Sequence, residues 1–421
     1  MMKHTTTMSS ALLALLLFVI VVVANAQGLS LDCTDPKSVQ RVKQEKPSTL
    51  QNVKDCGCSD IPGFVKAVAG NVTVTTTGSN VSALCFGSIT TVNGSVVARG
   101  SFKHGAISTA NFGNVSMVGG DVVLSRNLNL TTLDFGSVAS IGGNLDLSYN
   151  RLTTIKFGSL TTVGGTFDLW YNEFQKLHFG GLNTISGALN LSYNLALTNV
   201  DFGKLTHVGG DLDIVKTGLG SIDLTPLTSI GGSLNLTDNS IGSVDFGSLT
   251  SVTGSVDLAW TIADTLHLRN LTSVGGDLNL GGCMFDTVNM AKLTTVGGSL
   301  NIGWNSLDAF DSKSLTHIGG FLDLSFNELG NVTFPKLTHV GGYLDLSGND
   351  FDSIDFGSAL VRIDGYLDCS TNSLLNTINF GALTTVSGYL DVTDTDLTQL
   401  DCRGLGSCIK ADSSVSTIQW R

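Results

Sequence analysis

A short pattern of hydrophobic and polar positions recurs along most of the chain. Each copy has an aliphatic residue, two further residues and a Val or Ile, then a small corner, then an apolar–polar–apolar step. One copy begins at Leu160, reaches its corner after Val163 and continues with Phe167, Asp168 and Leu169. Such alternation is typical of short strands, and the copies contain no 3.6-residue stripe of the kind a helix needs. Each copy is therefore predicted to be a coil of short strands.

The second residue of the corner is glycine in every copy and sets the period. Successive glycines lie 22 or 23 residues apart after a first spacing of 26 residues. A fixed period of this size indicates a solenoid, in which each copy forms one rung. We therefore predict an all-β solenoid of about 14 rungs over residues 89–402. The glycines are Gly94, Gly120, Gly143, Gly165, Gly187, Gly210, Gly232, Gly254, Gly276, Gly298, Gly320, Gly342, Gly365 and Gly388.

A polar position follows three residues after the second apolar residue of the step. An inward asparagine there can bond backbone groups of its own and of the adjacent rung, so we predict a structural ladder and no catalytic role. The asparagines are Asn127, Asn150, Asn172, Asn194, Asn239, Asn305, Asn327, Asn349 and Asn372. Other copies place Ser101, Thr217, Thr261, Cys283 or Thr395 there.

This repeat, Leu-x-x-Val-Gly-Gly-x-Leu-x-Leu-x-x-Asn-x-Leu, resembles the leucine-rich repeat with the Gly-Gly corner of receptor L-domains. It is also similar to the receptor-L-type repeats of fungal cell-wall surface proteins. The resemblance covers about Ile89 to Cys402. It implies a right-handed parallel β-solenoid that is exported, has cysteine-containing end caps, and acts in recognition or wall organisation without catalysis.

Composition agrees with a folded, exported chain. Of the 421 residues 42% are hydrophobic and only 14% are charged, and the net charge of -12 makes nucleic acid an unsuitable partner. Lys3 and His4 precede an apolar run from Ala11 to Ala24, and a small-x-small cleavage pattern ends at Ala26. We predict a signal peptide over 1–26, with an uncleaved signal anchor as the alternative. No second apolar run follows, so the mature chain is predicted to lack a transmembrane segment and to be secreted, with cell-surface or cell-wall association.

Cysteines divide the remaining chain into caps and coil. A cap over 27–88 precedes the solenoid over 89–402, and 403–421 forms a C-terminal cap and tail; a short helix opening at Asp35 and Pro36 is expected to help close the first end. Cys283 and Cys369 lie four rungs apart, too far for a disulfide, and are predicted to be buried thiols. Disulfides of undetermined connectivity are expected at both ends, among Cys33, Cys56, Cys58, Cys85, Cys402 and Cys408.

The residue between the two apolar strand positions points away from the core and is acidic or amide in twelve successive copies. One interpretation is a surface for cations, calcium among them, for a calcium-bridged polymer or for a basic partner. The alternative is that small polar side chains stack well at this position; no other cofactor is expected. The row comprises Asp146, Asp168, Asn190, Asp213, Asn235, Asp257, Asn279, Asn301, Asp323, Asp345, Asp368 and Asp391.

Aromatic residues stand immediately before the asparagine ladder. Rings stack on the C–H faces of sugars while Asp and Asn bond hydroxyls, so we predict glycan binding; the alternative is that the rings cover corners of the coil. Only the first group is expected to be contiguous. The aromatics are Tyr149, Tyr171, Tyr193, Trp260, Trp304 and Phe326, with Trp170 beside Tyr171. The predicted binding residues are Asp146, Tyr149, Asp168, Trp170, Tyr171, Tyr193 and Asp213.

Nine glycosylation sequons are present, and several are expected to carry glycans. Glycans on Asn190 and Asn235 would shield part of the acidic row. The sequons begin at Asn71, Asn80, Asn93, Asn114, Asn129, Asn190, Asn235, Asn270 and Asn331.

No copy breaks the pattern in the way that a catalytic site would. His207, His317 and His339 fall in one repeated slot before Val or Ile, which favours a surface role over a base or metal ligand. We therefore predict a non-enzymatic adhesion or recognition protein that presents its acidic and aromatic surface to glycan, matrix or protein partners. The alternative is a carbohydrate-active β-helix hydrolase or lyase.

Overall fold

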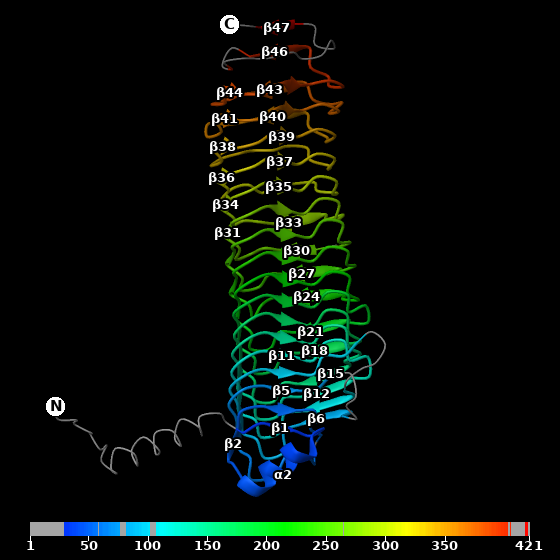
Figure 1. Cartoon of the computed structure of the whole chain (residues 1–421). Coiled ribbons are helices and arrows are strands. Elements are labelled where there is room, and N and C mark those ends of the chain that lie inside the picture. Colours follow the sequence, from blue (N-terminus) through cyan, green and yellow to red (C-terminus); the bar gives the residue numbers. More distant parts are fainter. Residues whose placement is uncertain are drawn as a thin grey trace, which may run out of the picture.

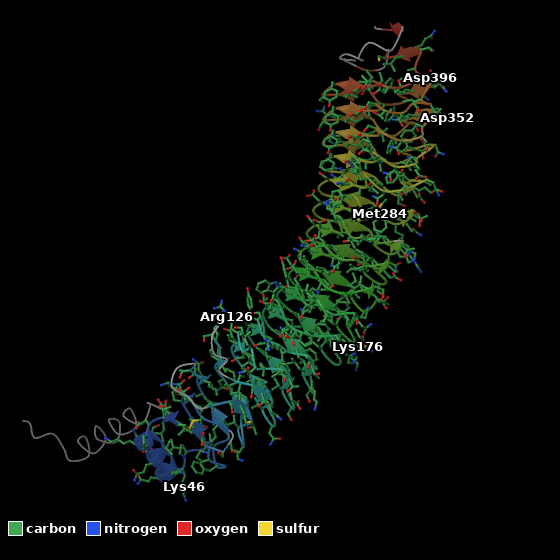
Figure 2. All side chains as sticks on the ribbon, turned by 90° about the vertical axis from the view of Figure 1, so that its right-hand side faces the viewer. Lys46, Arg126, Lys176, Met284, Asp352 and Asp396 are labelled. Atoms are coloured by element: carbon green, nitrogen blue, oxygen red, sulfur yellow. A yellow bond between two sulfur atoms is a disulfide. The ribbon has the colours of Figure 1, made fainter. Side chains whose placement is uncertain are left out.

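The computed structural model describes residues 29–57, 59–75, 81–101, 107–263, 265–402, 405 and the backbone of 417–419. The predicted signal peptide, Cys58, Asn80 and Cys408 lie outside these residues. Within them the chain winds into a rod with one helix at its N-terminal end (Figure 1). Seen from the side, the rod curves along its length (Figure 2).

Each rung contributes a strand to two long parallel sheets and, in most rungs, a strand to a third side. The 17 strands of the large sheet are β1 (Leu31–Asp32), β3 (Val53–Lys54), β5 (Val72–Thr73), β8 (Val96–Val97), β11 (Val122–Val123), β14 (Leu145–Asp146), β17 (Phe167–Asp168), β20 (Leu189–Asn190), β23 (Leu212–Asp213), β26 (Leu234–Asn235), β29 (Val256–Asp257), β32 (Leu278–Asn279), β35 (Leu300–Asn301), β37 (Leu322–Asp323), β39 (Leu344–Asp345), β42 (Leu367–Asp368) and β45 (Leu390–Asp391).

The 16 strands of the second sheet are β2 (Thr49–Leu50), β4 (Ala67–Val68), β7 (Thr91–Val92), β10 (Met117–Val118), β13 (Ser140–Ile141), β16 (Thr162–Val163), β19 (Thr184–Ile185), β22 (His207–Val208), β25 (Ser229–Ile230), β28 (Ser251–Val252), β31 (Ser273–Val274), β34 (Thr295–Val296), β36 (His317–Ile318), β38 (His339–Val340), β41 (Arg362–Ile363) and β44 (Thr385–Val386).

The third side is divided into short sheets. Its strands are β6 (Ala83–Cys85), β9 (Thr109–Asn111), β12 (Thr132–Asp134) and β15 (Thr154–Lys156); β18 (Lys176–His178) and β21 (Asn199–Asp201); β24 (Ser221–Asp223), β27 (Ser243–Asp245), β30 (Thr265–His267) and β33 (Thr287–Asn289); β40 (Ser353–Asp355) and β43 (Thr377–Asn379); and β46 (Gln399–Asp401) and β47 (Thr417–Gln419).

Every ladder pairs equivalent positions of successive copies. Phe167 of β17 pairs with Leu189 of β20, and Val163 of β16 pairs with Ile185 of β19, both in parallel. The predicted all-β parallel solenoid is therefore confirmed. The count of about 14 rungs was too low, because the large sheets hold 17 and 16 strands and the coil has about 16 rungs.

The missed rungs lie before residue 89. Strands β1, β3 and β5 join the large sheet directly through β8. The corner between β2 and β3 is Gln51 and Asn52, with no glycine, so the glycine period does not reveal it. In the regular rungs the corners stack so closely that a Cβ on Gly187, the second corner residue, would lie 2.6 Å from the backbone nitrogen of Thr166, which explains why glycine recurs at this position.

The core is a column of inward side chains. The aliphatic positions of both long sheets are buried, and phenylalanines after the third-side strands stack along the axis. The ring centroids of Phe157 and Phe179 are 5.5 Å apart, and those of Phe179 and Phe202 are 5.7 Å apart. Cys283 and Cys369 are free and buried in this column, where burial raises the pKa of the Cys283 thiol to about 11.

Buried asparagines line the corner that follows the large sheet. The amide nitrogen of Asn194 donates to the carbonyl oxygen of Leu191 (2.7 Å) in its own rung and of Leu169 (3.1 Å) in the preceding rung. Its side-chain oxygen accepts a hydrogen bond from the backbone N–H of Asn172 (3.1 Å). All nine asparagines donate to their own and the preceding rung in this way. They satisfy backbone groups at a bend that no strand ladder reaches.

The N-terminal end begins with helix α2 (Pro36–Glu45), which opens at Asp35 and Pro36 as predicted. The Asp35 carboxylate caps it by accepting hydrogen bonds from the backbone N–H groups of Lys37 (3.0 Å) and Ser38 (3.3 Å). Its one fully buried side chain, Val42, joins the core. No helix within the described residues is long and apolar enough to cross a membrane.

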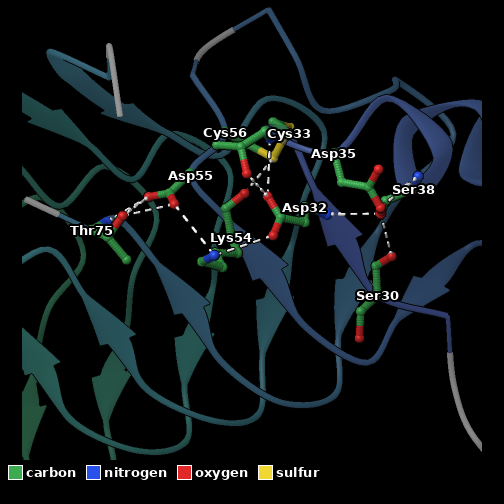
Figure 3. A network of polar contacts seen from close by, with 10 residues as sticks. Ser30, Asp32, Cys33, Asp35, Ser38, Lys54, Asp55, Cys56 and Thr75 are labelled. Carbon is green, nitrogen blue, oxygen red and sulfur yellow. Dashed lines mark hydrogen bonds and ion pairs between the residues drawn. A yellow bond between two sulfur atoms is a disulfide. The ribbon is translucent and has the colours of Figure 1, made fainter. Parts of the chain in front are cut away.

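A disulfide and a polar network hold the first rungs together (Figure 3). Cys33 is bonded to Cys56, and the Lys54 ammonium lies 3.2 Å from the Asp32 carboxylate and 3.8 Å from that of Asp55. Cys85 and Cys402 are also in disulfides. Each end of the coil therefore contains a covalent cross-link.

Candidate functional site

The acidic row lies along the outward face of the large sheet. The side-chain oxygen of Asp168 accepts a hydrogen bond from the backbone N–H of Trp170 (2.9 Å), two residues ahead. Eleven of the twelve row residues make this bond, Asp213 being the exception. Asp and Asn both offer a side-chain oxygen that can accept this hydrogen bond at the end of the strand. This structural role by itself accounts for the presence of an acid or an amide at this position. The second carboxylate oxygen is left for other contacts.

The row carries negative charge that neighbouring residues do little to offset. Burial, and after it neighbouring carboxylates, raise the pKa values of Asp168, Asp345 and Asp368. The one ion pair made by the row within the described chain joins Arg99 to Asp146 (3.8 Å). The described residues contain no group of three or more His, Cys, Asp or Glu side chains arranged to hold a metal ion. Calcium binding by the acidic row therefore stays a prediction, and no cluster of ligands among the described residues supports it.

The aromatics occupy an unusual backbone position. Tyr149, Tyr171, Tyr193 and their equivalents have φ values from 52° to 60°, in the left-handed region. Bulky residues rarely adopt this conformation, which costs about 1–3 kcal/mol for each such residue. Since Gly282 takes the same position in another rung, the corner itself does not demand a ring. We call this line of left-handed residues the aromatic corner; Figure 2 shows one of its members, Arg126, across the rod from Lys176 of β18.

The predicted binding cluster is brought together. Trp170 packs nearly at right angles against Tyr149 (centroids 4.3 Å apart) and Tyr193 (5.5 Å), and Tyr171 lies 5.4 Å from Tyr149. Trp170 therefore supports its neighbours, while Tyr171 is 51% exposed. The Lys216 ammonium lies 5.4 Å from the centroid of the Tyr193 ring, a cation–π contact. We call these four rings the first aromatic section.

The expectation that only this group is contiguous is wrong. Trp304 and Phe326 stack with centroids 4.1 Å apart. A Cβ on Gly282, in the rung between Trp260 and Trp304, would lie 2.9 Å from the Trp260 ring, so that indole packs onto the next rung. Each of these contacts joins adjacent copies, because the ring of a left-handed residue lies against the next rung. We call Trp260, Trp304 and Phe326 the second aromatic section.

A third aromatic group was missed. Phe321, Tyr343, Tyr366 and Tyr389 follow the second corner glycine and stack with centroids 4.5, 4.5 and 4.9 Å apart. Burial, with nearby Asp323 and Asp345, raises the pKa of Tyr343 to about 12. Their recurrence in one slot was the available signal. Because the rings cover each other's faces, this stack is a seam on the large sheet and offers few open faces.

The described sequons differ in accessibility. Asn71, Asn93, Asn114, Asn129 and Asn331 are exposed. Half-buried Asn190 and Asn235 accept hydrogen bonds from the backbone N–H groups of Ser192 (3.0 Å) and Thr237 (3.1 Å). The Asn270 amide, also half-buried, donates to the carbonyl oxygen of Gly247 (2.7 Å). Occupancy of the sequons stays a prediction, with the five exposed ones best placed.

The histidines of the repeated slot lie on the second sheet. His339 bonds the Asp364 carboxylate (2.9 Å), which Arg362 also contacts, and these two partners hold the pKa of Asp364 below its usual value. His207 bonds the hydroxyl of Ser229 (2.9 Å). Both bonds link adjacent rungs on the surface of the second sheet, which agrees with the predicted surface role.

Hollows occur on the third side. They have volumes of about 350, 490 and 510 Å³ and lie near His178, His267 and Asn111. None of the three is lined by the acidic row or the aromatic corner. The candidate surface is therefore an open ridge beside an acidic face.

Comparison with known proteins finds only distant structural similarities. No family model and no curated protein matches the chain. It is similar to the functional domain of InlJ from Listeria monocytogenes, with 18% identity, a TM-score of 0.33 and 73% of this chain covered; the chain spans 64% of that protein's length. It is also similar to YopM from Yersinia enterocolitica (14% identity, TM-score 0.25, covering 91% of this chain and 93% of that one). A third similar structure is the Toll–Spatzle complex of Drosophila (12% identity, TM-score 0.26, covering 93% and 67%).

These neighbours are leucine-rich-repeat proteins, and similarity this low carries no conclusion about function. The period and ladders of the chain itself make it a leucine-rich-repeat-like solenoid. The resemblance to receptor L-domains and fungal cell-wall proteins stays a prediction.

Proposed function

We propose that this protein is a secreted, non-enzymatic recognition protein that binds glycan through the first aromatic section and the acidic row beside it. The observation that carries the proposal is the cost of the aromatic corner. Successive rungs hold bulky rings in the left-handed region, where glycine would be more stable, and leave Tyr171 half exposed. Strain of this kind is retained where function requires it.

The neighbouring polar groups support a sugar ligand. Asp168 commits one oxygen to the backbone and leaves the other for a hydroxyl, whereas the second oxygen of Asp146 lies 3.8 Å from the Arg99 guanidinium. Rings beside free acceptors match the apolar faces and hydroxyl edges of a sugar. We infer that the partner is an extracellular or cell-wall glycan. If no glycan binds, the partner of this surface would instead be a protein.

A glycan array, read with calcium and with a chelator, tests the proposal. We expect binding that Tyr171→Ala together with Tyr193→Ala weakens by about tenfold, while Leu374→Ala, which removes an exposed side chain elsewhere, leaves it unchanged. Binding unaffected by the tyrosine pair contradicts the site. If Asp168→Lys with Asp213→Lys also changes nothing, the acidic row has no part in it.

A reducing-sugar release assay on the bound glycans distinguishes recognition alone from cleavage by a hydrolase or a lyase. We expect no product above a heat-denatured control. Turnover would overturn the non-enzymatic proposal, and His339→Ala would then test the pair formed with Asp364.

A further inference from the structure

The second aromatic section is the most exposed apolar surface among the described residues of the corner. Trp260 is 73% exposed, Trp304 is 60% exposed, and Met284 between them is 63% exposed. Contiguous apolar side chains of this size on a soluble protein usually mark an interaction surface.

The rings present open faces. One face of the Trp304 indole is covered by Phe326, and its high exposure leaves the other to solvent. Phe326 in turn packs at Gly348, where a Cβ would lie 2.8 Å from the ring. Glycine beneath these rings lets them settle along the rod axis, in contrast to the tyrosine seam, whose faces are mutually covered.

The row residues beside the middle of this section are neutral, while Asp257 and Asp323 stand at its two ends. Asn279 and Asn301 stand in the acidic row here, and their side-chain oxygens accept hydrogen bonds from the backbone N–H groups of Gly281 (3.3 Å) and Gly303 (3.0 Å). Their amide nitrogens remain as donors beside the rings. A Cβ on Gly281 would lie 2.8 Å from the Asn301 amide nitrogen, and one on Gly303 would lie 2.8 Å from a carboxylate oxygen of Asp323, so each of these row residues packs over the glycine of the preceding rung. Neutral donors next to open indoles suit a neutral polyhydroxyl chain better than a cation.

Both aromatic sections lie on the same corner of the coil. From Tyr149 to Phe326 the corner passes through nine successive rungs, a length of roughly 38 Å at about 4.8 Å per rung. The two sections are separated by Lys216 and Asp238, which form an ion pair (3.6 Å). The aromatic corner is thus a line of sites along the curved rod, interrupted by Lys216 and Asp238 between the sections and by Gly282 within the second.

We propose that the aromatic corner binds a single long, neutral, unbranched polysaccharide laid parallel to the rod axis, with both aromatic sections engaged at once. This proposal rests on the proposed function, from which it takes glycan as the class of ligand. It adds that the second aromatic section also binds the ligand, and that the ligand is neutral and long. Engagement of two linked sections raises affinity beyond that of either one, provided that the chain spans both.

The test is calorimetric titration with neutral β-linked glucan and chitin oligosaccharides, from disaccharide to decasaccharide. We expect affinity to rise steeply once the chain spans both sections. Trp260→Ala together with Trp304→Ala should then weaken the longest chain at least about tenfold and leave short-chain binding at the first section intact. Trp260→Phe with Trp304→Phe should retain most of the affinity, and Leu374→Ala all of it. Thermal melting shows that each variant is folded.

The outcomes separate the two proposals. If Tyr171→Ala with Tyr193→Ala abolishes binding while the tryptophan pair changes nothing at any length, the proposed function stands and the long-ligand proposal falls. If no neutral glycan binds at any length, both fall. If the tryptophan pair instead abolishes self-association in sedimentation without changing glycan affinity, the second section is a contact between copies and the proposal is overturned. Binding of the longest chain should also change little between low and high salt, whereas a steep salt dependence would contradict a neutral ligand.

Discussion

Replacing Asn194 by alanine should show how much the asparagine ladder contributes to stability. The side chain is fully buried, and its hydrogen bonds reach backbone groups of its own rung and of the preceding rung. Alanine would leave the carbonyls of Leu169 and Leu191 and the N–H of Asn172 buried without these partners.

The Leu169 carbonyl keeps the side-chain amide of Asn172 (3.0 Å) as a donor, so two groups lose their partner, the carbonyl of Leu191 and the N–H of Asn172. Each buried polar group left unsatisfied costs about 1–3 kcal/mol, so Asn194→Ala should lower the free energy of unfolding by about 2 kcal/mol or more. Asn194→Thr should cost less, because Thr261 in the same slot of another rung donates its hydroxyl to the carbonyl of Leu236 (2.9 Å). A threonine at 194 would keep one of the lost bonds.

Urea unfolding and native-state hydrogen exchange measure this effect. In a solenoid each rung contacts mainly its neighbours, so exchange should quicken first in the rungs of Asn172 and Asn194. Asn199→Ala is the matched control, since Asn199 is exposed on β21. A loss below about 0.5 kcal/mol for Asn194→Ala, equal to that of the control, would refute the ladder as a source of stability.

Three further predictions concern other positions. Thr371→Gly should raise the free energy of unfolding by about 1 kcal/mol, because Thr371 has a φ of 58°; a loss in urea titrations would show that its side chain stabilises the corner. Burial raises the pKa values of Asp345 and Asp368, so the native state binds protons more tightly than the unfolded chain, and stability should fall as pH rises from about 3.9 through the raised values. Asp345→Asn with Asp368→Asn should remove that fall and stabilise the protein by up to about 1 kcal/mol at pH 7; an unchanged difference between pH 4 and pH 7 contradicts this. Cys283 and Cys369, whose thiol pKa values are raised by burial, should resist a thiol reagent at pH 8 until denaturant is added, and prompt labelling of the native protein would be inconsistent with their burial.

The fold was largely predictable because its main signal repeats. Alternating apolar positions and corner glycines at a fixed period predicted the parallel coil, and the inward asparagine slot could be read from the same alignment of copies. The rung of β2 and β3 was not predicted because Gln51 and Asn52 replace its glycine corner, whereas the next rung carries Gly70, 24 residues before Gly94, and could have been found from the sequence. The pairing of Cys33 with Cys56 could not be predicted for the same reason. The two cysteines follow the paired strands β1 and β3, and the glycine period does not include these strands.

The candidate surface was only partly predictable, for a directional reason. Spacing places Trp260 and Trp304 two copies apart, and nothing in the sequence says that a left-handed backbone sends each ring toward the next rung. The stack of Tyr343, Tyr366 and Tyr389 was not predicted, although the three rings share the slot after the corner glycine in successive copies. Both contacts become visible only when the copies are superposed as rungs.

The ladders also bear on how such a gene can change. The bond between Asn172 and Asn194 joins equivalent positions 22 residues apart, and its counterparts join each asparagine oxygen to the preceding rung, either at the asparagine slot or two residues beyond it. Excising or duplicating one complete period by unequal recombination would bring matching partners together and require no compensating substitution. The length of the ridge is therefore a heritable quantity that can be adjusted in steps of one repeat.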